Sequence, residues 1–263
     1  MVMGLPFSVH IRGVHLRGAE SAAVARIWRD LRDADRIFST FRADSDISRI
    51  ARGELSVDDA HPSVAQVLAV AEAARRRTGG SFDVHHSGAL DPAGIVKAWA
   101  ARRAAHHLET LGGDWYLGAG GDVLLRSVSS RPWRVGIEHP GDPSGLLTAL
   151  DVGNGAVATS GRAHRGSHIV SPRTGRAPTT LSQATVYGPD LLWADIYATA
   201  WVAADTTAPG WSMMPGYECL LVTESGRTLC SPGMRAMLAM PESVDRARRP
   251  ESRTNRDQEV PAP

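Results

Sequence analysis

The sequence predicts an α+β fold, on two observations. Helical patterns dominate residues 21–111, and short strand-like runs bounded by glycine and proline dominate residues 115–187. Helices and strands are therefore grouped along the chain, whereas a doubly wound parallel sheet requires them to alternate. In addition, apolar residues make up 43% of the chain and charged residues 22%, which is typical of a globular protein.

The N-terminal half is expected to contain one strand followed by three helices. Residues 4–12 alternate apolar and polar side chains, which is the pattern of a half-buried strand. Three later segments have apolar residues at a spacing near 3.6 and end at residues that stop helices: 21–38, 63–77 and 92–111. Asp44-Ser45-Asp46 follows the first of them, and glycine pairs follow the other two.

The C-terminal half is expected to consist mainly of strands. Seven short runs are rich in strand-forming residues and bounded by turn residues: 115–117, 122–125, 133–137, 147–152, 155–159, 184–187 and 217–223. One more helix is expected over residues 191–203, after Pro189. From residue 241 onward, arginine, acidic residues and proline predominate, so this segment cannot bury enough apolar surface to fold. We therefore expect one domain over residues 1–240 and a disordered tail over residues 241–263.

Charge and composition exclude several classes of function. The 29 basic and 28 acidic side chains leave a formal charge of +1, which indicates no basic surface for nucleic acid or anionic lipid. No apolar run is long enough to span a bilayer, and the N-terminus lacks the pattern of a signal peptide. Cys219 and Cys230 are too few for a disulfide framework or a structural zinc site. The sequence therefore favours a cytoplasmic protein with no transmembrane segment and no nucleic-acid partner.

Six segments combine glycine with oxygen-bearing side chains: 3–4, 38–45, 79–83, 90–97, 118–122 and 158–175. Backbone N–H groups in such loops bind phosphate oxygens, although the same glycines also form ordinary turns. None has the spacing of a Walker A or Rossmann phosphate loop. One segment contains Lys97, the single lysine among 29 basic residues. Either this position needs a compact ammonium group, or Lys97 is an ordinary surface lysine.

Two further patterns suggest chemistry. Asp195 and Thr199 are four residues apart on a predicted helix, so they share one face and offer two oxygen ligands of the kind that Mg²⁺ prefers. A solvated surface pair is the alternative. The histidine pairs at 85–86 and 106–107 are adjacent in sequence and share no face, which argues against a zinc cluster. His168 lies in the last oxygen-rich segment, where a structural role is the alternative to a catalytic one.

Taken together and in order, these segments resemble the ApbE family, the FAD:protein FMN transferases. The matching motifs are Met3-Gly4, Ser39-Thr40-Phe41 with Asp44-Ser45, Gly79 to Asp83, Asp91 to Lys97, Gly120 to Asp122, Thr159 to Gly175, and Ala194 to Ala200. The resemblance spans roughly residues 3–225. It implies a tunnelling-fold-like architecture of antiparallel sheets with packed helices. It also implies a phosphoryl-type reaction that needs Mg²⁺, in which FAD is the substrate, FMN is joined to a threonine or serine of an acceptor flavoprotein, and AMP leaves.

The resemblance further implies roles for individual residues. Three of them match the Mg²⁺ ligands of the family: the Gly94 backbone carbonyl, Asp195 and Thr199. Eight match positions that contact FAD: Met3, Phe41, Ser81, Phe82, Asp83, Asp91, Lys97 and Ile169. His168 and Asp195 are the expected catalytic residues, with His168 as the general base by hypothesis.

The chain departs from the family pattern at a few positions. Phe41 replaces a more frequent tyrosine, Gly118 an asparagine, Ala163 an aromatic residue and Ser171 an aspartate. These changes leave the Asp195–Thr199 pair intact but affect the loop around residues 163–171. Two alternative functions therefore stay open beside the transferase: an FAD-binding protein without transferase activity, and an FAD pyrophosphatase that releases free FMN.

Overall fold

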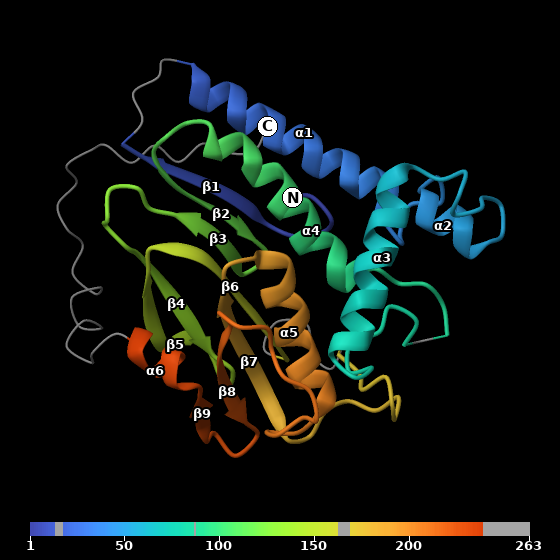
Figure 1. The fold of residues 1–263 in the computed structure, drawn as a ribbon. Helices are drawn as coiled ribbons and strands as arrows, with labels where there is room; N and C mark the ends of the chain where they lie inside the picture. Colours follow the sequence, from blue (N-terminus) through green and yellow to red (C-terminus); the bar gives the residue numbers. More distant parts are fainter. Residues whose placement is uncertain (14–17, 87, 163–168, 239–263) are drawn as a thin grey trace.

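The fold is built around a seven-stranded antiparallel sheet (Figure 1). The computed structural model describes residues 1–13, 18–86, 88–162 and 169–238. The strands of the large sheet are β1 Phe7–Arg12, β2 Asp114–Ala119, β3 Asp122–Arg126, β6 Asn154–Gly161, β7 Leu181–Gly188, β8 Glu218–Thr223 and β9 Thr228–Cys230. They follow one another in the order β1-β2-β3-β6-β7-β8-β9, with every neighbouring pair antiparallel. The predicted α+β class is therefore confirmed.

A small second sheet covers part of one face of the large sheet. It consists of β4 Trp133–His139 and β5 Asp142–Val152, which pair with each other. Ile137 and Leu150 from this pair bury themselves against Leu125 and Val157 of the large sheet. The short helix α6 Pro232–Met237 adds the fully buried Met234 to the same cluster. This smaller apolar core fixes the second sheet above the strands that hold the site described below.

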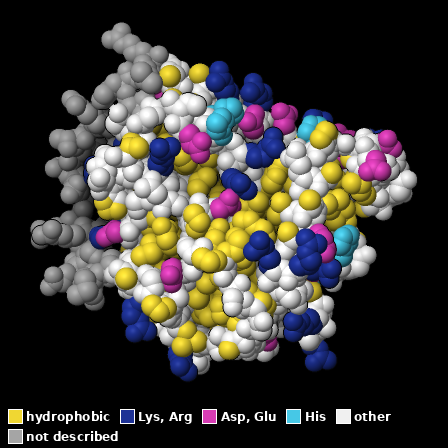
Figure 2. Space-filling model, viewed as in Figure 1, with side chains coloured by type: hydrophobic (Ala, Val, Ile, Leu, Met, Phe, Trp, Pro, Cys, Tyr) yellow, Lys and Arg dark blue, Asp and Glu magenta, His cyan; other side chains and the backbone are white. Residues whose placement is uncertain are grey.

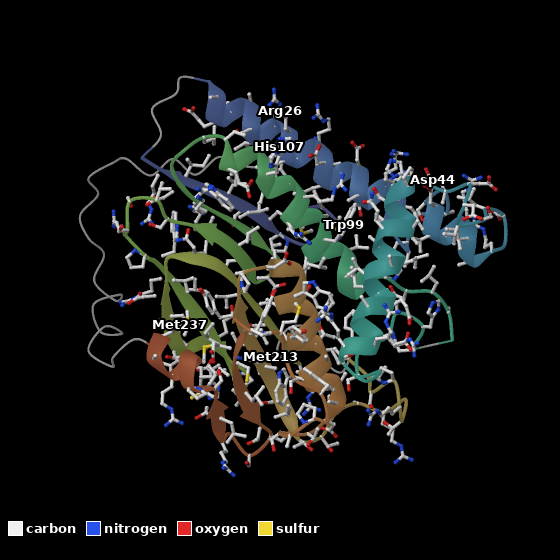
Figure 3. All side chains as sticks on the ribbon, viewed as in Figure 1. Arg26, Asp44, Trp99, His107, Met213 and Met237 are labelled. Carbon is white, nitrogen blue, oxygen red and sulfur yellow. The ribbon has the colours of Figure 1, made fainter. Side chains whose placement is uncertain are left out.

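Helices cover the opposite face of the large sheet (Figure 1). The helices α4 Ala93–Glu109 and α5 Leu191–Ala204 contact the sheet, and α1 Ala19–Phe38 and α3 Pro62–Arg77 pack outside them. Helix α5 packs on β6 and β7, α4 packs on α5, and α1 packs on α4. Trp99 of α4 meets Phe38 of α1 with ring centroids 5.4 Å apart, and His107 Nε2 lies 2.7 Å from an Asp30 carboxylate oxygen (Figure 3). In the described part of the chain, no helix is long and apolar enough to cross a membrane.

Three short elements are absent from the sequence-based expectation: β9, α6 and the helix α2 Asp46–Ala51. The start of α2 shows why. Ser45 accepts a hydrogen bond from the Ser48 N–H (3.1 Å) and so caps α2, while its own hydroxyl donates to the Ser39 carbonyl (2.6 Å). The Asp44-Ser45-Asp46 segment, expected only to follow the first helix, therefore begins a second one. The tail expected over residues 241–263 lies outside the described residues.

Apolar side chains gather across the middle of the face seen in Figure 1, and charged side chains lie mostly around its border (Figure 2). Aromatic and methionine side chains on α5 and in the loop that follows it are partly buried and pack against the main core: Trp193, Trp201, Trp211, Met213 and Met214. The Trp211 ring stacks on Tyr197 of α5 with centroids 5.8 Å apart. This packing holds the loop after α5 against the helix and brings Trp211 to the edge of the site.

Candidate functional site

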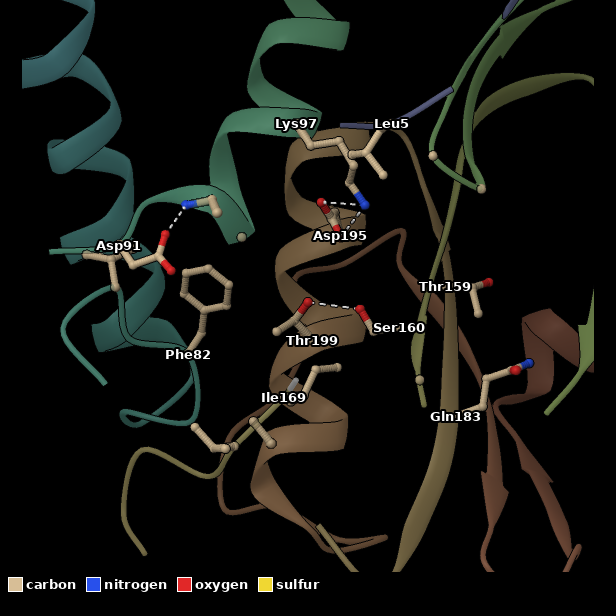
Figure 4. A pocket seen from close by; sticks show the side chains of 18 of the residues that line it. Leu5, Phe82, Asp91, Lys97, Thr159, Ser160, Ile169, Gln183, Asp195 and Thr199 are labelled. Carbon is tan, nitrogen blue, oxygen red and sulfur yellow. Dashed lines mark hydrogen bonds and ion pairs between the residues drawn. The ribbon is translucent and has the colours of Figure 1, made fainter. Parts of the chain in front are cut away.

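A cavity of about 850 Å³ lies where the N-terminal turns of α4, the middle of α5 and the strands β4, β6 and β7 meet. Its volume is in the usual range of ligand pockets. Ten of the predicted site residues line it: Phe41, Ser81, Phe82, Asp83, Asp91, Gly94, Lys97, Ile169, Asp195 and Thr199 (Figure 4). Met3 packs against the main core and does not line the cavity. His168 lies outside the described residues.

Hydrogen bonds from both sides hold the loop of residues 79–83 in place. The buried Thr78 Oγ1 donates to the Ala74 carbonyl (2.8 Å) and accepts from the Phe82 N–H (3.0 Å). At the other side of the loop, the Trp211 Nε1–H donates to Ser81 Oγ (3.3 Å). Gly79 and Gly80 have φ values of 56° and 81°, which favour glycine. The loop is therefore fixed from both sides before any ligand binds.

Thr78→Val is expected to lower the free energy of unfolding by about 1–3 kcal/mol and to weaken ligand binding, because the buried Phe82 N–H loses its acceptor. Urea unfolding measures the first effect, and FAD titration the second. Thr110 offers a matched control: it too follows a helix and donates to a carbonyl within it (3.1 Å), but it is exposed. Thr110→Val is expected to change stability by less than about 0.5 kcal/mol. Equal effects of the two substitutions would contradict this role of Thr78.

The first turn of α4 packs against the Phe82 ring. The Asp91 carboxylate accepts a hydrogen bond from the Ala93 N–H (3.0 Å) and so stabilises the start of the helix (Figure 4). A Cβ atom at Gly94 would lie 3.4 Å from the Phe82 ring. The Phe82 ring therefore lies directly beside the first turn of the helix, at the edge of the cavity.

Lys97 is paired with two buried carboxylates at one end of the cavity. Its Nζ lies 2.5 Å from Asp122 Oδ2 and 3.4 Å from Asp195 Oδ2. The Asp122 and Asp195 side chains are 1% and 4% exposed, and the Lys97 side chain is 18% exposed. Burial alone would lower the pKa of Lys97, but the charges and hydrogen bonds of the two carboxylates outweigh it and raise this pKa above its ordinary value. Lys97 is therefore a cation held inside the site.

Asp122 and Ser160 belong to this cluster although the sequence assigned neither of them a role. Asp122 Oδ1 accepts a hydrogen bond from the Thr159 N–H (3.0 Å). Ser160 Oγ lies 2.9 Å from Thr199 Oγ1 (Figure 4). Both are part of matched motifs, but only the packing of β3, β6 and α5 shows their partners. In the sequence, the single lysine Lys97 was the feature that could have indicated a nearby carboxylate such as Asp122, because a buried ammonium requires a counter-charge.

The oxygen atoms around Asp195 and Thr199 fit a hard divalent cation. In the described part of the chain, the cluster combines two carboxylates with one ammonium, and its negative charge favours binding of a cation. The donors at hand are a carboxylate, two hydroxyl groups and the backbone of Gly94, which is the oxygen chemistry that Mg²⁺ prefers. Among the described residues, no group of three or more His, Cys, Asp and Glu side chains is suited to a metal. Oxygen donors of this kind suit Mg²⁺, whereas transition metals commonly take nitrogen and sulfur ligands.

Phe41 lies at the mouth of the cavity and is almost fully exposed, at 99%. It is the most exposed of the large apolar side chains in the described part of the chain. Its backbone N–H donates to Ser39 Oγ (3.3 Å), which ties the residue to the end of α1. An exposed aromatic ring beside a cavity offers a flat apolar surface to a ligand without contributing to the core.

Comparisons with known proteins agree on one family. A family model described as "ApbE family" matches residues 3–88 and 85–220. An FAD:protein FMN transferase of Rhodobacter capsulatus is 34% identical over 137 residues, covering 48% of this chain and 26% of that protein. One from Klebsiella pneumoniae (strain 342) is 31% identical over 123 residues, covering 42% of this chain and 35% of that protein. The chain thus matches about a quarter to a third of the length of these relatives.

Two solved structures share the fold over nearly their whole length. The ApbE protein of Thermotoga maritima superposes with a TM-score of 0.76 at 19% identity, covering 91% of this chain and 98% of that one. The flavin transferase ApbE of Vibrio cholerae gives a TM-score of 0.73 at 19% identity, covering 90% and 97%.

Proposed function

Since the chain belongs to the ApbE family, we propose that it is an FAD:protein FMN transferase. The observation that best supports this function is the buried Lys97 beside Asp122 and Asp195, at the end of a cavity lined by the family's motifs. In the reaction, a threonine or serine hydroxyl of an acceptor protein attacks the FMN phosphorus of FAD. The bond between this phosphorus and the bridging oxygen breaks, FMN becomes a phosphoester of the acceptor, and AMP leaves.

Phosphoryl transfer depends mainly on positioning and on neutralising phosphate charge. Lys97 supplies a fixed positive charge inside the cavity, where it offsets the charge of the pyrophosphate. Asp195, Thr199 and the Gly94 carbonyl would hold Mg²⁺. When bound, this ion neutralises the pyrophosphate oxygens on which negative charge develops.

The remaining cavity residues position the rest of FAD. Phe82 and Ile169 offer apolar surface, and Ser81, Asp83 and Asp91 offer polar groups. Phe82 and Asp91 lie on the side of the cavity opposite Gln183 (Figure 4). His168 directly precedes Ile169 in the chain. We assign it the general base, which takes the proton from the acceptor hydroxyl as the phosphoester forms.

The reaction is tested by incubating the protein with FAD, Mg²⁺ and an acceptor protein. AMP release together with flavin fluorescence on the acceptor band of a denaturing gel supports the transferase. AMP and free FMN without labelled acceptor would indicate an FAD pyrophosphatase. FAD binding without AMP release would indicate a non-catalytic FAD-binding protein. Either of the last two results would contradict the proposed function.

Phe41→Ala is expected to weaken FAD binding about tenfold without changing the melting temperature. An aromatic side chain that stacks on a ligand ring contributes roughly 1–3 kcal/mol, whereas a side chain that is 99% exposed contributes little to folding. FAD titration and thermal unfolding measure the two quantities. Val128, which is also exposed but does not line the cavity, provides the control through Val128→Ala. Unchanged FAD affinity in Phe41→Ala would show that the ring does not contact the ligand.

A further inference from the structure

The Lys97 ammonium lies unevenly between its two carboxylates. Its Nζ is 2.5 Å from Asp122 Oδ2 but 3.4 Å from each of the two carboxylate oxygens of Asp195. The three side chains come from α4, from the start of β3 and from α5, so the asymmetry reflects how these elements pack. The ammonium is thus held mainly by the carboxylate that is not among the proposed metal ligands.

Asp122 is placed rigidly enough to hold this charge. Gly120 and Gly121, with φ values of 59° and 102°, form the two-residue turn between β2 and β3, a conformation that other residues rarely adopt. This turn makes Asp122 the first residue of β3, where it is 1% exposed. Its second oxygen accepts the Thr159 N–H at 3.0 Å. One oxygen of Asp122 is therefore anchored to β6, and the other faces Lys97.

A single carboxylate is enough to pair with a buried ammonium, and a second one in the same place costs desolvation energy. Without Asp122, the flexible Lys97 side chain would pair with Asp195, which among the described residues is the other carboxylate in contact with it. A closer ammonium at Asp195 competes directly with a metal ion for the same oxygens. The site therefore needs something that keeps Lys97 near the phosphate but away from Asp195.

We infer that Asp122 is this positioning residue: it holds the Lys97 ammonium away from Asp195, so that Asp195 binds a divalent cation while Lys97 stays in the cavity. The inference rests on the Mg²⁺ site proposed above and adds a residue to it. In this role, the Gly-Gly-Asp turn does more than connect β2 to β3. The turn sets the distance between two positive charges, the ammonium and the metal, that must act on one pyrophosphate.

The test is Mg²⁺ binding by isothermal titration calorimetry, without FAD or acceptor. Asp122→Asn keeps an oxygen for the Thr159 N–H but cannot pair with the ammonium, and we expect Mg²⁺ affinity to fall about tenfold, within the usual coupling of contacting charges. Loss of one negative charge also weakens Mg²⁺ binding by itself. For this reason the same substitution is repeated in Lys97→Met, where no ammonium is left to compete. In that background, Asp122→Asn is expected to lower Mg²⁺ affinity by less than about threefold.

The coupling between the two positions decides the inference. An equal loss in the wild-type and Lys97→Met backgrounds, or no loss in either, would overturn it. Asp122→Glu gives an independent comparison that retains both Lys97 and a carboxylate beside it. Its Mg²⁺ affinity is expected to stay within about threefold of the wild type. A loss in Asp122→Glu as large as in Asp122→Asn would also overturn the positioning role.

Two controls separate this inference from the function on which it rests. Asp114→Asn makes the same substitution at a residue that is 4% exposed but lies outside the cavity, and it is expected to leave Mg²⁺ binding unchanged. Asp195→Asn is expected to abolish Mg²⁺ binding. If Asp195→Asn binds Mg²⁺ like the wild type, the metal site itself is wrong, and the inference falls with it. If Asp195→Asn fails to bind but Asp122→Asn binds normally, only the role of Asp122 is wrong.

Discussion

Asp195→Asn is expected to lower Mg²⁺-dependent FMN transfer by at least about a hundredfold, since a bound metal contributes several kcal/mol of transition-state stabilisation. Asparagine keeps the shape and one oxygen of the side chain but removes the charged ligand from the proposed set. Because Lys97 lies 3.4 Å from Asp195, the substitution also leaves this ammonium with Asp122 as its remaining carboxylate. Removing a carboxylate from Lys97 favours phosphate binding, so a loss of turnover reports the loss of the metal ligand.

The measurement is AMP release over a range of Mg²⁺ concentrations. Thr199→Val is expected to lower AMP release less than Asp195→Asn does, because it removes a neutral ligand. It also breaks the 2.9 Å contact with Ser160 Oγ. Asp151→Asn is the control for loss of a carboxylate, since Asp151 is exposed on β5 and pairs with Arg134. Normal Mg²⁺-stimulated turnover in Asp195→Asn would remove the metal site from the proposal.

Lys97→Met is expected to lower the free energy of unfolding by about 3–5 kcal/mol in the presence of EDTA. This is the usual cost of removing one partner from a buried ion pair, and here it leaves two carboxylates that are 1% and 4% exposed without their ammonium. Mg²⁺ binds the folded state and supplies positive charge to the same cluster. Adding it is therefore expected to restore part of the lost stability.

Urea unfolding with EDTA and with excess Mg²⁺ measures this effect. FAD titration of the same variant is expected to show weaker binding, because the phosphate loses a fixed cation. Arg102→Met on the same helix is the control, because Arg102 is half exposed and pairs with Asp190. This substitution is expected to change the free energy of unfolding by less than about 0.5 kcal/mol. Equal stability of Lys97→Met and the wild type in EDTA would contradict the buried ion pair. A loss of stability that Mg²⁺ does not reduce would contradict a shared cluster.

The amino-acid sequence by itself was enough to predict the fold class and the places of the main helices and strands. Apolar periodicity is a local property, so the helices expected over 63–77 and 191–203 occur as α3 Pro62–Arg77 and α5 Leu191–Ala204. Composition singled out Lys97, and helical spacing put Asp195 and Thr199 on one face. Motif order identified the family, and the family model that matches residues 3–88 and 85–220 confirms this identification.

Only the tertiary structure decided which of these residues meet. Lys97, Asp122 and Asp195 are separated by 25 and 73 residues along the chain, and no periodic pattern relates a helix, a hairpin turn and a second helix. Their distances depend on how α4 and α5 pack on each other and on the large sheet. This packing is driven by the burial of apolar surface, which no local sequence pattern records. Asp122 therefore looked like the end of a turn in the sequence. In the fold, Asp122 is buried and its Oδ2 lies 2.5 Å from Lys97 Nζ. A buried carboxylate requires such a partner, which the sequence did not reveal.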